Sequence, residues 1–214
     1  RTTLQRALRK AEGEWERASA GPDSIFGDAV KATLADVRSI GSKRTQDWTV
    51  RSAAGAKKTV EKVKDKLPVE WWDASADFGP MQTNVVRRGF YRHNKHGASE
   101  LNVSGTGDKQ DDAALHEFMH RVEDTNPKVL AAQQAFYERR TAGESTVKLA
   151  DLYPGHAYGP REIVRVDNFS QPYAGKDYRD IGISGFEIAT MGVQDVYTAS
   201  GPKWKTDDED FLDF

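Results

Sequence analysis

Residues 115–123 read LHEFMHRVE and contain the pattern H-E-x-x-H. On a helix, residues four positions apart lie on the same face, so the imidazoles of His116 and His120 can bind one metal ion. Glu117 lies one residue further round, where its carboxylate can reach a water molecule on that metal. Bound zinc lowers the pKa of such a water and polarises a carbonyl, while the Glu takes the proton. The segment therefore predicts a metal-binding helix with Glu117 as general base.

The rest of this segment is apolar, which favours a helix with a single polar stripe. Its apolar side chains fall away from the two histidines and can bury the helix against a core: Leu115, Phe118, Met119 and Val122. A polar stripe on such a helix is difficult to explain without a ligand, because unpaired polar groups are costly to bury. The alternative is a surface helix whose two histidines are simply solvated.

A catalytic zinc site needs a third protein ligand, and two carboxylates compete for this role. Glu187, in the segment GFEIATMG, begins a separate predicted helix and can approach the two imidazoles from the side. Glu123 lies one turn beyond His120, where a straight helix does not easily let it converge with both histidines. We therefore predict Glu187 as the ligand and Glu123, or Asp124, as a partner of an imidazole N–H or as a salt-bridge residue. His156, in a loop, is the one rival nitrogen ligand.

Two tyrosines precede Glu187 closely enough to share its site. Tyr173 and Tyr178 lie in the segment QPYAGKDY, within a region rich in Gly and Pro. A phenol can stabilise the oxyanion that forms when a carbonyl is attacked, so we take Tyr178 as a second catalytic candidate, with Tyr173 as its neighbour. The alternative is that both rings are packing residues.

Charge divides the sequence into two parts near Pro68. Residues 1–67 carry 15 basic and 9 acidic side chains, whereas residues 68–214 carry 16 basic and 24 acidic ones. The first part is rich in Ala and Lys at helical spacing, and Pro68 stops its last predicted helix, residues 56–66. We therefore predict a helical arm over residues 1–67 and an α+β domain over residues 68–214.

The second part combines short strands with helices. The spacing predicts strands at residues 69–72, 85–91, 100–104 and near 163–166, and helices from 111 or 112 to at least 122, over about 128–141, and from about 185 to 197. The second and third strands flank a polar turn that holds His93 and His96, both expected to face solvent, and should form an antiparallel hairpin. We expect its outer strand to border the catalytic cleft, where an extended substrate can add by main-chain hydrogen bonds.

Composition excludes several classes of protein. The chain has no cysteine, which excludes disulfides, Cys-ligated zinc, iron–sulfur clusters and a thiol nucleophile. Its net charge of −2 argues against a nucleic-acid binder, which would carry a basic excess. No apolar run approaches a membrane span, which needs about 18 residues, so we expect no membrane partner. The start at Arg1 and the end at Phe214 indicate a fragment of a larger protein.

Three segments resemble the metallopeptidase-like domain of bacteriophage minor head proteins: residues 115–127, 171–178 and 186–192. They occur in the same order as in that group, and the acidic residues 207–211 resemble its tail. The helix motif with a downstream Glu is also similar, more distantly, to the catalytic domain of anthrax lethal factor and related gluzincin toxins. The resemblance covers residues 68–214 and implies a zincin-like fold with a helix Glu as third zinc ligand, which matches Glu187. Met119 departs from the Gly that many relatives carry.

These observations together predict a Zn²⁺-dependent endopeptidase of the gluzincin type that acts on a protein or peptide. The resemblance implies association with a phage particle, phage head proteins as partners, and a location in the virion or the host cytoplasm. One alternative is a structural minor capsid or connector component with a non-catalytic zincin fold. Another is a toxin protease delivered into a host.

Overall fold

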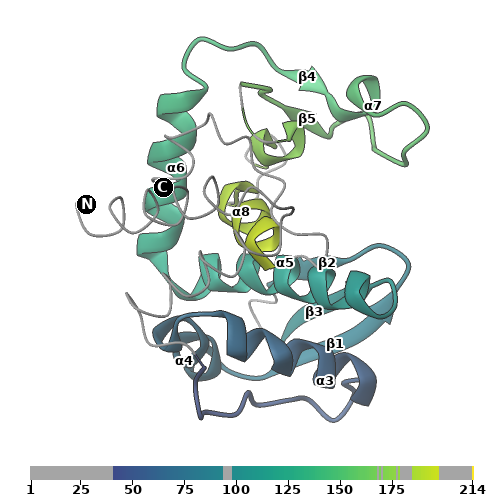
Figure 1. Cartoon of the computed structure of the whole chain (residues 1–214), viewed down its shortest axis with the longest axis vertical. Helices are drawn as coiled ribbons and strands as arrows, with labels where there is room; N and C mark the ends of the chain where they lie inside the picture. Colours follow the sequence, from purple (N-terminus) through teal and green to yellow (C-terminus); the bar gives the residue numbers. More distant parts are fainter. Residues whose placement is uncertain are drawn as a thin grey trace, which may run out of the picture.

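The structure is a computed structural model, and it describes residues 41–93, 98–167, 169, 171–176, 178, 185–197 and 214. This part of the chain is mixed α and β, as predicted (Figure 1). Residues 1–40, which make up most of the predicted helical arm, lie outside the described residues. Among the described helices, none is both long and apolar enough to cross a membrane.

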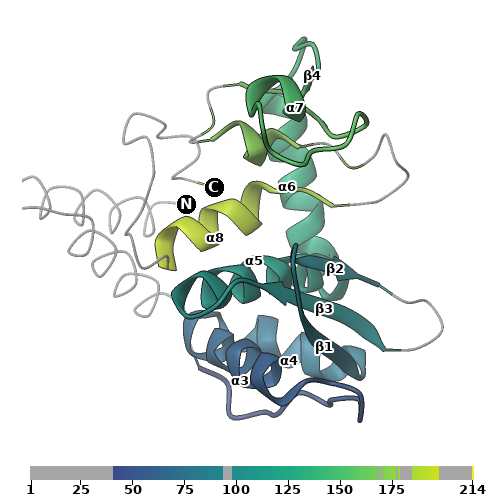
Figure 2. The same cartoon turned by 90° about the vertical axis from the view of Figure 1, so that its right-hand side faces the viewer.

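The lower half of the molecule in Figure 2, residues 41–125, begins with helices that lie below α5 (Asp108–Thr125). Helix α3 (Ala54–Glu61) continues into the 3₁₀ helix η1 (Lys62–Lys66), which agrees with the single helix predicted there. Helix α4 (Val69–Phe78) starts directly after Pro68. The strand predicted at residues 69–72 is therefore wrong. So short a run of bulky residues is also typical of a strand. Pro68, however, fixes a backbone angle that suits the start of a helix, and in this helix Trp72 faces the core.

A three-stranded sheet covers one side of this half. Its strands are β1 (Met81–Val86), β2 (Phe90–Arg92) and β3 (Ser99–Ser104), in the order β1-β3-β2. The predicted hairpin is confirmed, because β2 pairs antiparallel with β3, while the turn residues 94–97 lie outside the described part. The single strand predicted at residues 85–91 is wrong. These residues belong to two strands, β1 and β2, and β1 runs parallel to β3. The alternation of side chains along the sequence does not show the break at residues 87–89.

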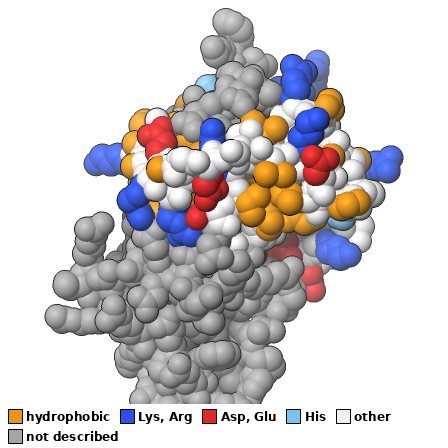
Figure 3. Space-filling model, turned by 90° about the horizontal axis from the view of Figure 1, so that it is seen from above, with side chains coloured by type: hydrophobic (Ala, Val, Ile, Leu, Met, Phe, Trp, Pro, Cys, Tyr) orange, Lys and Arg blue, Asp and Glu red, His pale blue; other side chains and the backbone are white. Residues whose placement is uncertain are grey.

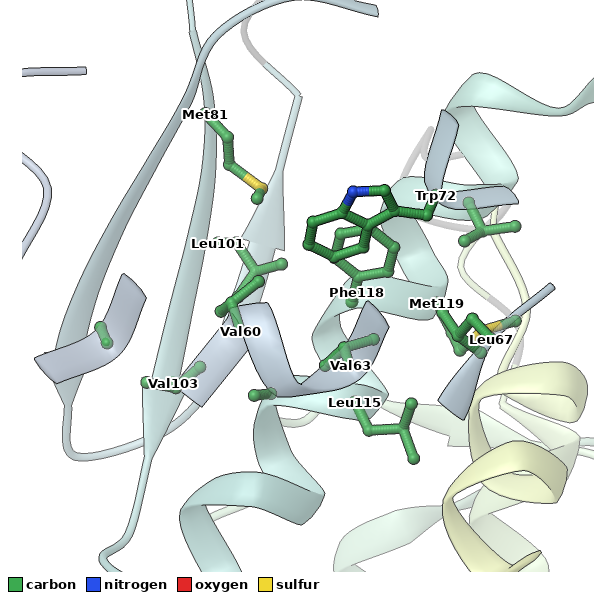
Figure 4. Packing of buried hydrophobic residues seen from close by; sticks show 13 residues of the cluster. Val60, Val63, Leu67, Trp72, Met81, Leu101, Val103, Leu115, Phe118 and Met119 are labelled. Carbon is green, nitrogen blue, oxygen red and sulfur yellow. The ribbon is translucent and has the colours of Figure 1, made fainter. Parts of the chain in front are cut away.

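Helix α5 (Asp108–Thr125) packs on the inner face of the sheet and carries the H-E-x-x-H segment. It begins after Gly107, about one turn earlier than predicted. The predicted apolar face is confirmed, since Leu115, Phe118, Met119 and Val122 are all buried. Phe118 stacks on the indole of Trp72 at a centroid distance of 5.0 Å, and residues of the sheet and of α3 close around the two rings (Figure 4).

The described part of the predicted arm belongs to this same core. Val60, Val63 and Leu67 are buried in one cluster with Phe118 and Leu101 (Figure 4). Residues 41–67 thus pack as an integral layer of the lower half. The boundary at residues 67 and 68 stays a prediction for the chain as a whole.

The upper half, residues 126–197, is built around a second apolar cluster. Helix α6 (Pro127–Arg140) rises from the end of α5, and helix α8 (Ile188–Tyr197) lies across α5 (Figure 2). Between them come β4 (Val147–Lys148), α7 (Leu149–Leu152), β5 (Ile163–Val164) and the 3₁₀ helix η2 (Pro172–Gly175). The helix predicted over residues 128–141 and the strand near 163–166 are confirmed. The last helix begins at Ile188, slightly later than predicted.

Candidate metal centre

Two helices from different halves of the molecule meet at the predicted metal ligands. Helix α5 directs His116 and His120 to one side, with ring centroids 5.3 Å apart. Glu187 lies just before the first residue of α8 and is completely buried. One ligand atom from each of the three residues lies within 4.8 Å of the other two. The structure therefore brings together the three residues that the sequence predicted, although they come from distant parts of the chain.

The three side chains also point at one another with suitable atoms. Nε2 of His116 lies 3.1 Å from Oε2 of Glu187, and Nε2 of His120 lies 3.5 Å from the same oxygen. Ligands of a tetrahedral zinc ion, at about 2.0–2.1 Å from the metal, are about 3.3–3.4 Å apart. Two imidazole nitrogens and a carboxylate oxygen are ligands that suit zinc better than Mg²⁺ or Ca²⁺. The residues present therefore fit a zinc ion, although they do not by themselves identify the metal.

The other nitrogen of each imidazole is held by a side chain, which fixes the orientation of the ring. Nδ1 of His116 lies 3.0 Å from Oε1 of Gln194, and Nδ1 of His120 lies 3.0 Å from Oε2 of Glu123. With Nδ1 occupied in this way, Nε2 of both rings is left to face Glu187. Glu123 thus occupies the supporting position predicted for it. Gln194 was not predicted, because no sequence pattern links it to His116.

Glu123 ties the metal helix to the upper half. Its Oε1 accepts hydrogen bonds from Nε2 of Gln133 at 2.7 Å and from the backbone N–H of Phe186 at 3.2 Å. Phe186 immediately precedes Glu187, so the carboxylate that orients His120 also anchors the backbone beside the third candidate ligand. Asp124, the alternative to Glu123, lies elsewhere, 3.5 Å from Nδ1 of His93.

Two hydroxyl groups hold the Glu187 carboxylate. The Tyr178 hydroxyl donates a hydrogen bond to Oε1, and the Thr190 hydroxyl donates one to Oε2 at 2.9 Å. Oε2 is the oxygen that faces both imidazoles. Tyr178 therefore lies at the site as predicted, in contact with a candidate ligand. Thr190 was missed, although its position one helical turn after Glu187 was a usable signal.

Burial and charge shift the pKa values of all three candidate ligands. Burial lowers the pKa of His116, but the neighbouring Glu187 carboxylate outweighs this effect and raises it. The pKa of His120 is raised well above its usual value because Glu187 and Glu123 likewise outweigh burial. Burial raises the pKa of Glu187, but the two imidazoles hold it well below the usual range. The centre is thus a compact and largely buried group in which the imidazoles and the carboxylate favour each other's charged forms.

Glu117 occupies a position next to this group without being part of it. It is only 7% exposed, and burial raises its pKa although His116 and His120 act in the opposite direction. A Cβ atom at Gly89 would lie 2.7 Å from Oε1 of Glu117, so a larger residue at position 89 would displace this carboxylate from its present place. Among the described residues, no group donates a hydrogen bond to Glu117. Its carboxylate is therefore available to accept a proton from water.

A buried lysine was not predicted from the sequence. Lys176 is 5% exposed, and its Nζ lies 4.4 Å from the ring centroid of Tyr178 and 3.3 Å from the Tyr173 hydroxyl. Its charge is balanced by Glu162, whose Oε2 is 3.0 Å away. The cation thus fixes both predicted tyrosines beside the centre. A single Lys in a Gly-rich segment gave no signal of this role.

The remaining histidines in the described part of the chain lie away from the ligand group. His93 is exposed and faces Asp124, as expected for a residue beside the hairpin turn. His156 is exposed and stacks on Tyr158, so it does not act as a third ligand. His96 lies outside the described residues.

Comparisons with protein-family models, with curated proteins and with solved structures find no match to this chain.

Proposed function

We propose that this protein is a zinc-dependent endopeptidase of the gluzincin type, with His116, His120 and Glu187 as metal ligands and Glu117 as general base. The observation that carries the proposal is the convergence of these three side chains, beside the Glu117 carboxylate, which accepts no hydrogen bond from any residue in the described part of the chain. Structural ion-pair networks also bring charged groups together. They do not usually leave a nearly buried carboxylate without a hydrogen-bond donor.

Each residue of the site has a role in this proposal. A bound zinc ion would polarise the scissile carbonyl and lower the pKa of a water molecule. The carboxylate of Glu117, with a raised pKa, accepts the proton of the attacking water and passes it to the leaving amine. The Tyr178 hydroxyl donates its one hydrogen to Glu187 and so orients the third ligand. In this proposal the hydroxyl exchanges that bond for one to the oxyanion when the carbonyl is attacked.

The proposed substrate is an extended stretch of protein that adds to strand β2. This strand is an edge of its sheet, and in the described part of the chain its outer side forms no backbone hydrogen bond. Gly89 lies directly before β2, and a Cβ atom there would lie 2.7 Å from Oε1 of Glu117, so the edge leads to the proposed base. Main-chain pairing tolerates many side chains.

The biological setting that we propose is a phage particle, with head proteins as substrates or partners and a location in the virion or the host cytoplasm. It rests on the resemblance of residues 115–127, 171–178 and 186–192 to the phage head domain. We propose neither a nucleic acid nor a membrane as a partner.

The decisive experiment compares Glu117→Gln with the wild-type protein after metal analysis of both. We expect one zinc ion per chain in each, and a loss of at least about 100-fold in cleavage of phage head proteins for the variant. Glu138→Gln, an exposed carboxylate on α6, is the matched control and should retain full activity. His116→Ala should lose metal and activity together. Equal cleavage by wild type and Glu117→Gln would overturn the assignment of the base.

One observation favours a structural alternative, in which the metal only stabilises a capsid or connector component. The side chains of His116 and His120 are 13% exposed and Glu187 is fully buried, as in a structural metal site. On this alternative, a fully metal-loaded protein cleaves none of the head proteins, while chelation still lowers its melting temperature.

A further inference from the structure

Four aromatic rings form a continuous series that leads from the surface to the candidate metal centre. We call the series, Tyr153, His156, Tyr158 and Tyr173, the aromatic ladder. Tyr153, His156 and Tyr158 contact one another, with ring centroids 5.8 Å apart for Tyr153 and His156 and 5.9 Å apart for the other two pairs. The ring centroids of Tyr158 and Tyr173 are 6.2 Å apart. Tyr173 then lies 6.4 Å from the ring of His116. The last step of the ladder therefore reaches a candidate metal ligand.

The outer rings of the ladder are accessible. His156 is exposed and Tyr153 and Tyr158 are half-buried in the loop after α7. Figure 3 looks down on the end of the molecule that carries β4, α7 and β5, and it shows hydrophobic side chains, a class that includes Tyr, gathered beside charged ones. Large rings that remain in contact with water while touching one another are typical of binding surfaces.

The loop that presents these rings is held in place by hydrogen bonds. Arg88 donates to both carboxylate oxygens of Glu162, at 3.2 and 2.8 Å, and to the carbonyl of Ala157 at 3.3 Å. Glu162 also accepts from the backbone N–H of Gly159 at 3.0 Å and from Nζ of Lys176 at 3.0 Å. The rings are therefore fixed before any ligand arrives, which lowers the entropy cost of binding.

The ion pair that anchors the loop persists at neutral pH. Burial raises the pKa of Glu162, but hydrogen bonds from Arg88, Gly159 and Lys176 outweigh burial and bring it to about 2. The guanidinium of Arg88 also lies 5.6 Å from the ring centroid of Tyr158. Since Arg88 follows β1 in the lower half, this contact places the ladder beside the proposed path of the substrate.

We propose that the aromatic ladder is a specificity subsite that binds an aromatic side chain of the peptide substrate, close to the scissile bond. This inference rests on the proposed function and names the substrate class of the same site. Aromatic rings prefer neighbours at centroid distances of about 4.5–7 Å, and such pairs gain stability beyond their buried area. Tyr158 is separated from His116 by two ring-to-ring distances, from Tyr158 to Tyr173 and from Tyr173 to His116. Three or four residues of an extended chain, at about 3.3 Å per residue, span this length.

The test measures peptide binding by the zinc-loaded, full-length Glu117→Gln protein, so that cleavage does not interfere. The probes are two pools of randomised decapeptides that differ at one fixed position, which is Phe in one pool and cyclohexylalanine in the other. The two side chains have similar size, but only Phe is aromatic. We expect the immobilised protein to retain the Phe pool about two- to tenfold better.

Variants locate the preference on the protein. In the same Glu117→Gln background, Tyr153→Leu and Tyr158→Leu should abolish the preference for Phe while zinc content and melting temperature stay unchanged. Phe78→Leu removes an exposed ring on α4, away from the ladder, and should keep the preference. Equal retention of the two pools, or a preference that survives both Tyr variants, overturns the inference. The inference is also overturned if the wild-type protein self-associates and Tyr158→Leu abolishes this association. The ladder would then be a contact between copies of this chain.

The two proposals can fail separately. If the Phe preference depends on Tyr153 and Tyr158 but the wild-type protein cleaves no peptide, the proposed function fails and the ladder stands as an aromatic-peptide site. If the wild type cleaves both pools equally, the proposed function stands and the subsite is wrong.

Discussion

Each oxygen of the Glu187 carboxylate is held by a different hydroxyl group, and only one of these oxygens faces the imidazoles. Tyr178 holds Oε1, while Thr190 donates to Oε2. Mutating a residue that orients a metal ligand in this way typically lowers metal affinity or activity by about 10–100-fold. The hydroxyls of Tyr178 and Thr190 therefore help to set the geometry of the centre although neither is a ligand.

Replacing Thr190 with Val removes one of these hydroxyls and keeps the shape of the side chain. We expect zinc affinity to fall by about 10–100-fold, because Oε2 loses a fixed donor and the carboxylate can rotate. Competition with a chromogenic chelator measures the change. Thr125→Val, which removes a hydroxyl bonded only within α5, should leave the affinity unchanged. The same affinity for wild type and Thr190→Val would show that Thr190 does not position Glu187.

Zinc affinity should rise with pH. The pKa values of His116 and His120 are raised above 6.5, whereas zinc binds neutral imidazole, so protons compete with the metal near neutral pH. Glu187, with a lowered pKa, is already ionised and contributes no proton. We therefore expect zinc binding at pH 7 to release protons, up to two per ion, and fewer as the pH increases. Calorimetric titrations in buffers of different ionisation enthalpy count these protons, and zinc binding without proton release would contradict the charged cluster.

The residues that could be predicted from the sequence are those whose chemistry leaves a local pattern. The pair His116 and His120, with Glu117 between them, follows from helical spacing alone. Glu187 followed from its place at a helix start, and the structure puts it where that argument required. Gln194 and Lys176 could not be predicted, because their roles arise from contacts between segments far apart in the chain.

Among the elements, α4 and α5 are joined by a fully buried arginine. Nε of Arg121 donates to the hydroxyl of Ser75 at 2.7 Å, and Nη2 donates to the carbonyls of Ser75 and Gly79 at 2.9 and 2.8 Å. The Gly79 carbonyl lies just past the end of α4, where helices leave carbonyl groups without an intrahelical partner. Arg121 satisfies both carbonyls and fixes the two helices at their contact.

Arg121→Met tests the contribution of this contact. The change removes the donor to the hydroxyl and carbonyl of the buried Ser75, while the Gly79 carbonyl keeps its hydrogen bond from Nε2 of Gln46 at 3.0 Å. We expect a loss of about 1–3 kcal/mol in the free energy of unfolding. Urea unfolding followed by circular dichroism measures it. Arg161→Met, at an exposed arginine in the loop before β5, is the control and should change stability by less than about 0.5 kcal/mol. Equal stability of the two variants would mean that Arg121 does not join the helices.

The errors in the predicted elements have a common cause. Residues 69–72 are a short run with bulky side chains, and a run of that length fits a strand and one turn of a helix equally well. Residues 85–91 contain the ends of two strands, and so few residues of each do not show where one strand stops. Longer periodic segments, such as α5 and α6, were placed to within about a turn. The parallel pairing of β1 with β3 depends on a crossover through residues 87–98, and no local pattern specifies where a strand goes after such a connection.

For the whole molecule, the candidate metal centre lies between two apolar clusters that, in the described part of the chain, have no residue in common. The lower core contains Phe118 and Leu101, and the upper one contains Phe136 and Phe186. His116 and His120 come from α5 in the lower half, while Glu187 precedes α8 in the upper half. The helices α5 and α8 pack on each other directly at this level (Figure 2). A metal ion bound there would link the two halves.

Removing the metal should therefore destabilise the molecule as a unit. With free zinc at about 1,000 times the dissociation constant, binding adds about 4 kcal/mol, which corresponds to about 8–16 °C in melting temperature for a chain of this size. Differential scanning calorimetry with zinc and with a chelator measures the shift. His116→Ala should melt at the same temperature in both conditions. A chelator that removes the metal without changing the wild-type melting temperature would show that the ion does not link the halves.

The distance along the chain between His120 and Glu187 also has a consequence for synthesis. A ribosome adds about 5–20 residues per second, so the two histidines leave it several seconds before Glu187 does. During that interval the nascent chain carries two imidazoles on α5 but not the carboxylate that completes the ligand group. On the proposed function, a protein that hydrolyses peptide bonds would thus remain inactive until its upper half has been translated and has folded onto the lower one, and the unfinished chain would be no danger to its neighbours on the polysome.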